Sequence, residues 1–137
     1  MIEVFADSGY FVGLLNPRDP YRELVQDVST KLDAARLVTS ELVIVETLNY
    51  LSRSRPDLRQ AAAVWASGAL SGRLMRVIRF GTQQLNAAIE HYHDRPDKFW
   101  SLTDCASMET MRRLGLNQVL STDHHFEQAG FTILLKR

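Results

Sequence analysis

Short apolar segments alternate with segments of helical periodicity along this chain of 137 residues. The apolar segments have the length and the composition of buried strands, and they lie at residues 2–6, 36–39, 74–80, 118–122 and 131–135. Parallel strands need long crossover connections, which are usually helices. The sequence therefore predicts an α/β fold, a three-layer α/β/α sandwich in which helices cover both faces of a mainly parallel central sheet.

The helical segments begin and end at ordinary capping and breaking residues. Ser40 precedes a helix over residues 41–53, which ends before Pro56 because a residue that precedes proline disfavours the helical region. Gly115 follows a helix over 101–114 and suits the left-handed position after its last turn. The other predicted helices lie at residues 11–15, 21–35, 58–70 and 83–95, with one further turn between Asp123 and Gly130.

Length and charge narrow the class of protein. A chain of 137 residues lies near the commonest domain size, so we expect a single domain over residues 1–137. Sixteen Lys and Arg balance sixteen Asp and Glu, which excludes a global positive field that would hold nucleic acid. No segment resembles a secretion signal or approaches the ~20 apolar residues of a membrane span. Since its one cysteine, Cys105, cannot form an internal disulfide, we expect a cytoplasmic protein without a membrane partner.

Four acidic residues stand where the local pattern ends a strand, opens a helix or interrupts an apolar helix: Asp7, Glu46, Asp104 and Asp123. Ligands of parallel sheets bind at the carboxyl ends of the strands, where Asp7 and Asp123 are predicted to lie. Two carboxylates at ~4 Å repel by about 4 kcal/mol at an effective dielectric near 20, so a converging cluster needs protons or a metal. Oxygen ligands of this kind suit Mg²⁺ or Mn²⁺, which can activate water for phosphoryl transfer.

Each acid also has a plainer structural explanation. Asp7, Asp104 and Asp123 could each cap or stabilise the first turn of a helix. Glu46 lies in a helix that is apolar nearly all round, which predicts burial and the need for a partner. Arg53 lies on the same face two turns later, so a structural ion pair between the two is the alternative to a metal-site role for Glu46.

Other polar and aromatic residues offer weaker signals. The basic stretch at residues 52–59 contains Arg53 and Arg55, which could contact an RNA backbone or simply form a solvated helix end. His124 and His125 follow Asp123 and could contact an RNA phosphate, although a solvated loop or a packing role explains them better. Trp100 is predicted to pack in the core or at a dimer interface rather than to stack on bases.

Four segments resemble the PIN domain family in order and spacing, and together they cover essentially the whole chain. They lie at residues 5–20, 38–51, 100–115 and 119–131. Within the family the chain looks most like small bacterial and archaeal single-domain members, including toxins of the VapC kind. The resemblance implies an endoribonuclease that depends on Mg²⁺ or Mn²⁺ and cleaves single-stranded RNA.

The resemblance also implies roles for individual residues and partners. Asp7 and Asp104 match the principal metal ligands, and Glu46 and Asp123 match the acids that complete the catalytic site. The residues that match positions orienting these carboxylates are Ser8, Ser107 and Thr122. In toxin members a cognate antitoxin protein folds over the pocket, and a homodimer is expected on the same ground.

Two other classes of function are weighed against the nuclease. A non-catalytic PIN-like module that binds RNA or protein would have no reason to keep four mutually repelling carboxylates. A phosphotransfer or phosphatase domain on a similar sheet would need a second acid two residues after Asp7, where Gly9 stands. The sequence favours the metal-dependent endoribonuclease.

Overall fold

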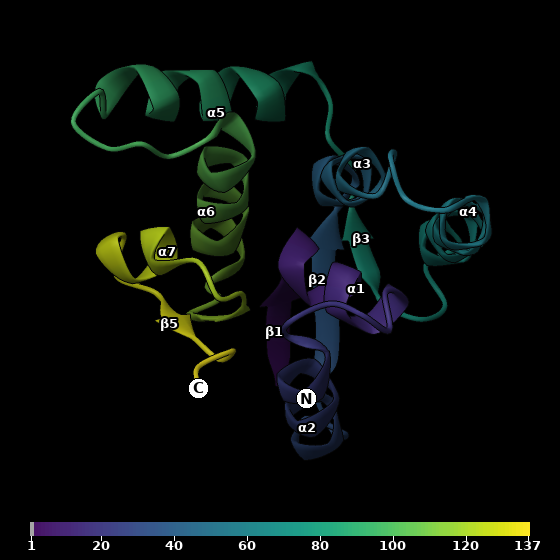
Figure 1. Ribbon diagram of the computed structural model, residues 1–137. Coiled ribbons are helices and arrows are strands. Elements are labelled where there is room, and N and C mark those ends of the chain that lie inside the picture. The colour runs from purple at the N-terminus through teal and green to yellow at the C-terminus, as the bar shows by residue number, and fades with distance from the viewer. Residues whose placement is uncertain (1) are drawn as a thin grey trace.

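A computed structural model describes residues 2–137, and five strands form one sheet with the order β3-β2-β1-β4-β5 (Figure 1). All four neighbouring pairs are parallel, which confirms the predicted sheet. The strands are β1 Glu3–Ala6, β2 Arg36–Ser40, β3 Arg76–Ile78, β4 Gln118–Leu120 and β5 Thr132–Ile133.

Helices cover the sheet on both sides, as a three-layer sandwich requires. The helices are α1 Ser8–Leu15, α2 Arg22–Lys31, α3 Glu41–Tyr50, α4 Pro56–Leu70, α5 Thr82–Asp94, α6 Leu102–Leu114 and α7 His124–Gln128. Figure 1 shows α1 to α4 on one side of the central strands and α5 to α7 on the other. This division follows from right-handed crossovers, because the chain first adds strands on one side of β1 and then on the other. No helix described between residues 2 and 137 is long and apolar enough to cross a membrane.

The direction of the strand order reverses between β1 and β4. These strands pair in parallel register, with Phe5 opposite Val119 and Ala6 opposite Leu120. The backbone N–H of Asp7 donates to the carbonyl of Leu120 at 3.2 Å and carries this pairing one residue past β1. Open α/β sheets bind ligands outside the carboxyl ends of the strands at such a reversal. The topology therefore selects the rim that follows β1 and β4 as the place for a site.

The core fills both faces of the sheet. Strand residues Val4, Phe5, Val38, Val119 and Leu120 are fully buried, which explains why their segments are apolar without alternation. Helix α6 adds side chains to the same core, and these include Cys105, Met108 and Met111. Trp100, just before α6, belongs to this core and is 5% exposed, which confirms its predicted packing role.

Several elements are shorter than the sequence predicts. Helix α2 ends at Lys31 rather than near residue 35, because the turn over 32–35 is closed by the N–H of Ala35 on the carbonyl of Leu32 at 2.8 Å. Strand β3 covers only part of 74–80: the N–H of Phe80 donates to the carboxylate of Glu41 at 2.8 Å instead of continuing the sheet.

The prediction that the helix containing Glu46 is buried all round is wrong. Helix α3 leaves Val45 49% exposed and Tyr50 70% exposed, and Glu46 itself is half-buried. One face of α3 lies against α1, α4 and α6, and the opposite face is open to solvent. Because Glu46 is only half-buried, its burial does not by itself require an ion-pair partner.

Gly13 marks a close approach between α1 and α2, and substitution tests it. A methyl group at Gly13 would lie 2.6 Å from Cγ2 of Val25, which is fully buried and has no room to move. We expect Gly13→Ala to lower the free energy of unfolding by about 1–3 kcal/mol through overpacking. Urea denaturation measures the change.

Gly9 provides the matched control in the same helix. No atom lies within 4 Å of a methyl group placed there. Gly9→Ala should be neutral or should raise stability by up to about 1 kcal/mol, because alanine is the better helix former. Equal stability of the two variants would contradict the close packing of α1 on α2.

Candidate active site

Asp7 follows β1 directly and lies at the position that precedes α1. Its carboxylate makes no capping hydrogen bond to that helix, so the predicted capping role is wrong for this residue. Instead Oδ2 accepts a hydrogen bond from the hydroxyl of Ser121 at 2.9 Å. Asp7 is 7% exposed, and its carboxylate is thus held across the β1–β4 boundary rather than along its own helix.

The protonation of Asp7 reflects this environment. Burial, and after it the negative charge of Glu46, raises the pKa of Asp7 from 3.8 to about 7, with a smaller contribution from Asp104. Hydrogen bonds from the Ser8 backbone and from Ser121 act in the opposite direction. The pKa shift of Asp7 is upward because no nearby positive charge offsets the effect of burial.

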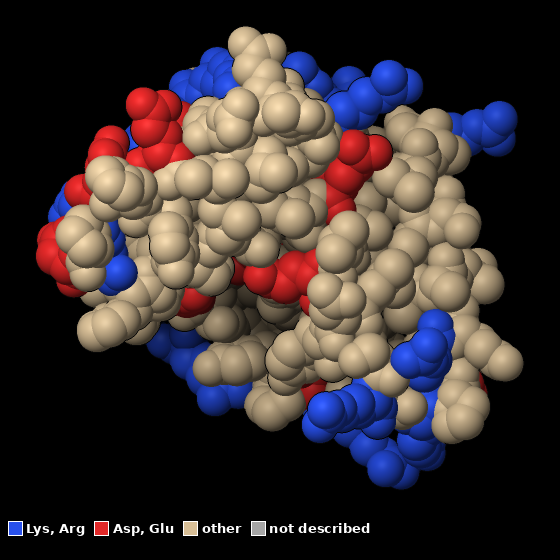
Figure 2. Space-filling view, turned by 90° about the horizontal axis from the view of Figure 1, so that it is seen from above, with Lys and Arg blue, Asp and Glu red and all other residues tan. Residues whose placement is uncertain are grey.

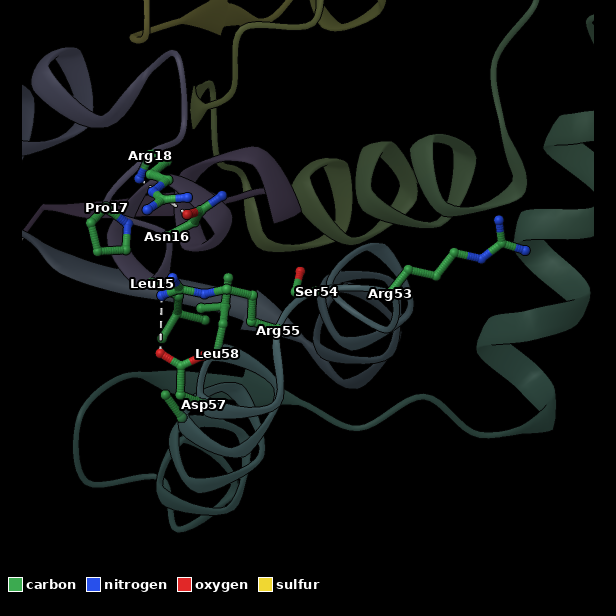
Figure 3. A pocket seen from close by; sticks show the side chains of 10 residues that line it. Leu15, Asn16, Pro17, Arg18, Arg53, Ser54, Arg55, Asp57 and Leu58 are labelled. Atoms are coloured by element: carbon green, nitrogen blue, oxygen red, sulfur yellow. Dashed lines mark hydrogen bonds and ion pairs between the residues drawn. The ribbon is translucent and has the colours of Figure 1, made fainter.

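Glu46 approaches the same rim from α3. The hydroxyl of Ser8, the first residue of α1, donates to Oε1 of Glu46 at 2.5 Å. Within residues 2–137, Glu46 forms no ion pair with Arg53, and Figure 3 shows the Arg53 side chain extending away from the other labelled residues. The alternative of a Glu46–Arg53 pair therefore finds no support in the structure.

Asp104 lies in the first turn of α6 and serves that helix as predicted. The hydroxyl of Ser101 accepts the N–H of Asp104 at 3.0 Å, and Oδ2 of Asp104 accepts the N–H of Ser101 at 3.0 Å. This is a reciprocal capping box. Burial, and after it the charge of Asp123, raises the pKa of Asp104, while hydrogen bonds from Ser101 and His125 oppose the shift. Asp104 is 8% exposed, and its carboxylate both caps α6 and belongs to the acidic rim, the name used below for the sheet edge with Asp7, Glu46, Asp104 and Asp123.

His125 connects Asp123, the acid that follows β4, to Asp104. Oδ1 of Asp123 accepts the backbone N–H of His125 at 2.9 Å, which confirms its predicted capping role for α7. Nδ1 of His125 lies 3.1 Å from Oδ2 of Asp104 and 3.2 Å from Oδ1 of Asp123. His124, the predicted RNA contact, is largely exposed, with its Nδ1 3.9 Å from Asp123.

Ser121 is the connecting residue that sequence reasoning missed. Its hydroxyl donates to Asp7 and accepts the backbone N–H of Asp123 at 3.0 Å, so it joins the ends of β1 and β4. Thr122 was predicted in this role, and its hydroxyl makes no hydrogen bond among the described residues. Successive residues of an extended segment point to opposite sides, and the sequence does not show which side faces the acids. The hydroxyl of Ser107 is buried without a partner within residues 2–137, so its orienting role stays a prediction.

The four acids thus reach one rim from four elements. Figure 2, which looks onto this end of the molecule, shows acidic side chains in a hollow and basic side chains toward the outline. Among the described residues, no Lys or Arg forms an ion pair with any of these acids, and only histidines do so. Asp123, His124 and His125 also offer ligand atoms within 4.8 Å of one another. Carboxylates without cationic partners fit a hard divalent cation.

Arg53 and Arg55, the predicted RNA contacts, line a different pocket. This pocket of about 530 Å³ lies between the end of α1 and the start of α4 (Figure 3). Arg55 pairs there with Asp57 at 3.1 Å, and Arg18 enters from the loop after α1. The pocket is separated from Asp7 by the length of α1, roughly 12 Å. Arg55 therefore lies away from the acidic rim, the Arg53 side chain points out of this pocket (Figure 3), and an RNA contact by either residue stays a prediction.

Comparison with known proteins identifies relatives of the whole chain. The model of the PIN domain family matches residues 4–132. No curated protein sequence matches the chain. Among solved structures, Mycobacterium tuberculosis VapC20, described as a sarcin-ricin loop cleaving toxin, superposes with a TM-score of 0.81 at 24% identity over 94% of this chain and 96% of that one.

Two further solved structures are similar to this chain. VapBC2 from Rickettsia felis bound to promoter DNA has a TM-score of 0.67 at 11% identity and covers 98% of both chains. FitAcB from Neisseria gonorrhoeae has a TM-score of 0.66 at 14% identity and covers 96% of both chains. At these identities the likeness establishes a shared fold.

The raised pKa of Asp7 predicts a stability that falls as pH rises. Between pH 4 and pH 7 the folded protein holds a proton on Asp7 that the unfolded chain has lost, so deprotonation opposes folding in this window. We expect the free energy of unfolding in EDTA to drop by about 2 kcal/mol from pH 5 to pH 7.5. Most of this drop should disappear in Asp7→Asn, and an equal drop in that variant would contradict the assignment.

Proposed function

Since the chain belongs to the PIN domain family, we propose that it is a metal-dependent endoribonuclease that hydrolyses phosphodiester bonds of single-stranded RNA. The observation that carries the proposal is the convergence of Asp7, Glu46, Asp104 and Asp123 on one rim without a Lys or Arg partner in the described chain. We further propose that residues 1–137 form a single nuclease domain that acts in the cytoplasm.

The cofactor that fits this donor set is Mg²⁺ or Mn²⁺. Hard divalent ions choose carboxylate oxygens, and Mg²⁺ retains several waters beside one or two carboxylates. We assign Asp7 and Asp104, the two most buried acids, as the residues that would hold the ion, with Glu46 and Asp123 completing the site directly or through water. A bound ion would lower the pKa of a water nucleophile and offset charge on the phosphate.

The protein's own contribution is to fix the carboxylates in place. Ser121 holds Asp7, Ser8 holds Glu46, and Ser101 holds Asp104 through the capping box. His125 lies between Asp104 and Asp123 and keeps these two acids together. Polar partners of metal-binding carboxylates orient them and typically change activity or affinity by 10- to 100-fold when removed.

RNA is the substrate class that the relatives support. VapC20 is described as cleaving the sarcin-ricin loop, which is RNA. In this chain the exposed His124 next to Asp123 is a candidate phosphate contact, and Arg53 and Arg55 remain candidates for a more distant stretch of the strand. Because the net charge is zero, these contacts would be local and salt-sensitive.

We propose that the protein is the toxin of a type II toxin–antitoxin pair and forms a homodimer. An antitoxin partner is what the resemblance to toxins of the VapC kind implies, and similar structures include VapC20, described as a toxin, VapBC2 bound to promoter DNA and FitAB bound to a DNA fragment. An acidic rim without cationic partners would accept a basic antitoxin side chain as readily as a metal ion. A basic antitoxin segment at this rim would therefore inhibit by competing with the ion.

Cleavage assays test the nuclease proposal. Purified protein should cleave single-stranded RNA with Mg²⁺ and should lose activity in EDTA. Asp7→Asn and Asp104→Asn should each lower kcat/KM by at least about 100-fold, since a direct ligand contributes more than its outer partners.

Asp27→Asn is the matched control for these variants. Asp27 lies on α2 and forms an exposed pair with Lys31. Its substitution should leave cleavage unchanged. Undiminished cleavage by the Asp7→Asn, Asp104→Asn double variant would contradict the proposal, and RNA binding without any cleavage would favour a non-catalytic binding module.

A further inference from the structure

An aromatic groove adjoins the acidic rim and has no part in holding the acids. It is a cavity of about 760 Å³ between the end of α5 and the loop over residues 95–101. We propose that this groove, called the stacking groove below, binds unpaired nucleotides next to the scissile phosphate of the RNA. The proposal rests on the nuclease function proposed above and adds to it a surface that binds the bases of the RNA.

The exposure of two aromatic rings is the first argument. Phe99 is 92% exposed and Tyr92 is 56% exposed, and both line the groove together with the buried Trp100. The Trp100 indole N–H donates to Oε1 of Gln128 at 3.0 Å, so the floor of the groove is fixed to α7. Exposed rings over a fixed floor form a stacking platform of the kind that binds single-stranded nucleic acid without strong sequence preference.

The charge around these rings suits a phosphate backbone. The Arg95 guanidinium lies 5.3 Å from the centre of the Trp100 ring, and the Lys98 ammonium lies 6.0 Å from it. Asp97 neutralises Arg95 through two hydrogen bonds of 3.0 Å. Lys98 forms no ion pair within residues 2–137, so its charge is available to a phosphate beside a stacked base.

Position relative to the acids is the third argument. Ser101 lines the groove, and its backbone N–H donates to Oδ2 of Asp104. Gln128, which anchors Trp100, lies on α7, the helix that Asp123 caps. The C-terminal end of the loop that carries Phe99 is thus attached, through Trp100 and Ser101, to the elements that present Asp104 and Asp123. The groove therefore adjoins the place where the scissile phosphate would bind.

A second copy of the chain is the competing occupant. Leu85, Ile89 and Tyr92 are exposed on α5 at helical spacing, and such a stripe could pack against another copy. The stacking groove differs from a typical interface core because Lys98 lines it together with the rings. Lys is depleted at the centre of protein interfaces, whereas aromatic residues and Arg are enriched there, so it is Lys98 that argues against a protein occupant. RNA is therefore the occupant that the composition of the groove favours.

Single-turnover cleavage of a single-stranded RNA at increasing protein concentration tests the groove. Phe99→Leu and Tyr92→Leu should each raise the half-saturating concentration roughly 5- to 100-fold while the rate at saturation stays within about twofold. Phe99→Tyr should restore binding, because it keeps the ring. Val64→Leu on α4, whose side chain is 74% exposed, is the control and should match the wild type.

Two further measurements separate the possible failures. Sedimentation of each variant reports the oligomeric state: loss of dimer in Phe99→Leu with unchanged RNA affinity would overturn the proposal in favour of a second copy. Fluorescence anisotropy with labelled RNA in EDTA reports binding without cleavage. Weaker RNA binding by Phe99→Leu in this assay would support the stacking groove even if the wild type failed to cleave. Equal half-saturating concentrations for Phe99→Leu, Tyr92→Leu and Val64→Leu in the cleavage assay would reject the groove and leave the nuclease function intact.

Discussion

The main constraint on this structure is the negative charge at one rim of the sheet. No lysine or arginine of the described chain neutralises it. Asp7 is the clearest case: burial at the boundary between β1 and β4, and after it the charges of Glu46 and Asp104, raise its pKa to about 7. A buried carboxyl group of this kind lowers stability when it ionises, so a fold retains it only where something else is gained. Under the function proposed above, binding of a divalent cation would be that gain.

The fold tolerates this charge because its local structures stabilise each acid separately. Helices α1 and α6 both begin at the rim, and their N-terminal N–H groups and dipoles favour nearby negative charge. Asp104 and Asp123 also act as capping residues, so each contributes to helix stability before any metal binds. Capping and metal binding are thus compatible uses of the same side chains. Asp7 and Glu46 make no capping hydrogen bond, and they accept hydrogen bonds from Ser121 and Ser8 instead.

The fold, the acids and Ser8 were predictable from the sequence, whereas Ser121 and His125, which also support the acids, were not. Apolar segments alternating with helical ones specify a parallel sheet, and strand ends specify where Asp7 and Asp123 lie. Whether Ser121 or Thr122 faces the acids depends on the twist of the chain where it leaves β4, which no local pattern encodes. His125 reaches Asp104 only because α7 folds back against α6, a tertiary contact. The ends of α2 and β3 were likewise decided by turns and by the bond from Phe80 to Glu41.

Calorimetric titration of the metal-free protein with Mn²⁺ tests the central claim most directly. The account predicts that the wild type and Asp27→Asn bind the ion alike, and that Asp7→Asn and Asp104→Asn bind it at least about 10-fold more weakly. Raising the pH from 5.5 to 7.5 should strengthen binding to the wild type, because Asp7 loses its proton in this range. Equal affinity of all four proteins, or no binding by the wild type, would contradict the assignment of the rim as a cation site.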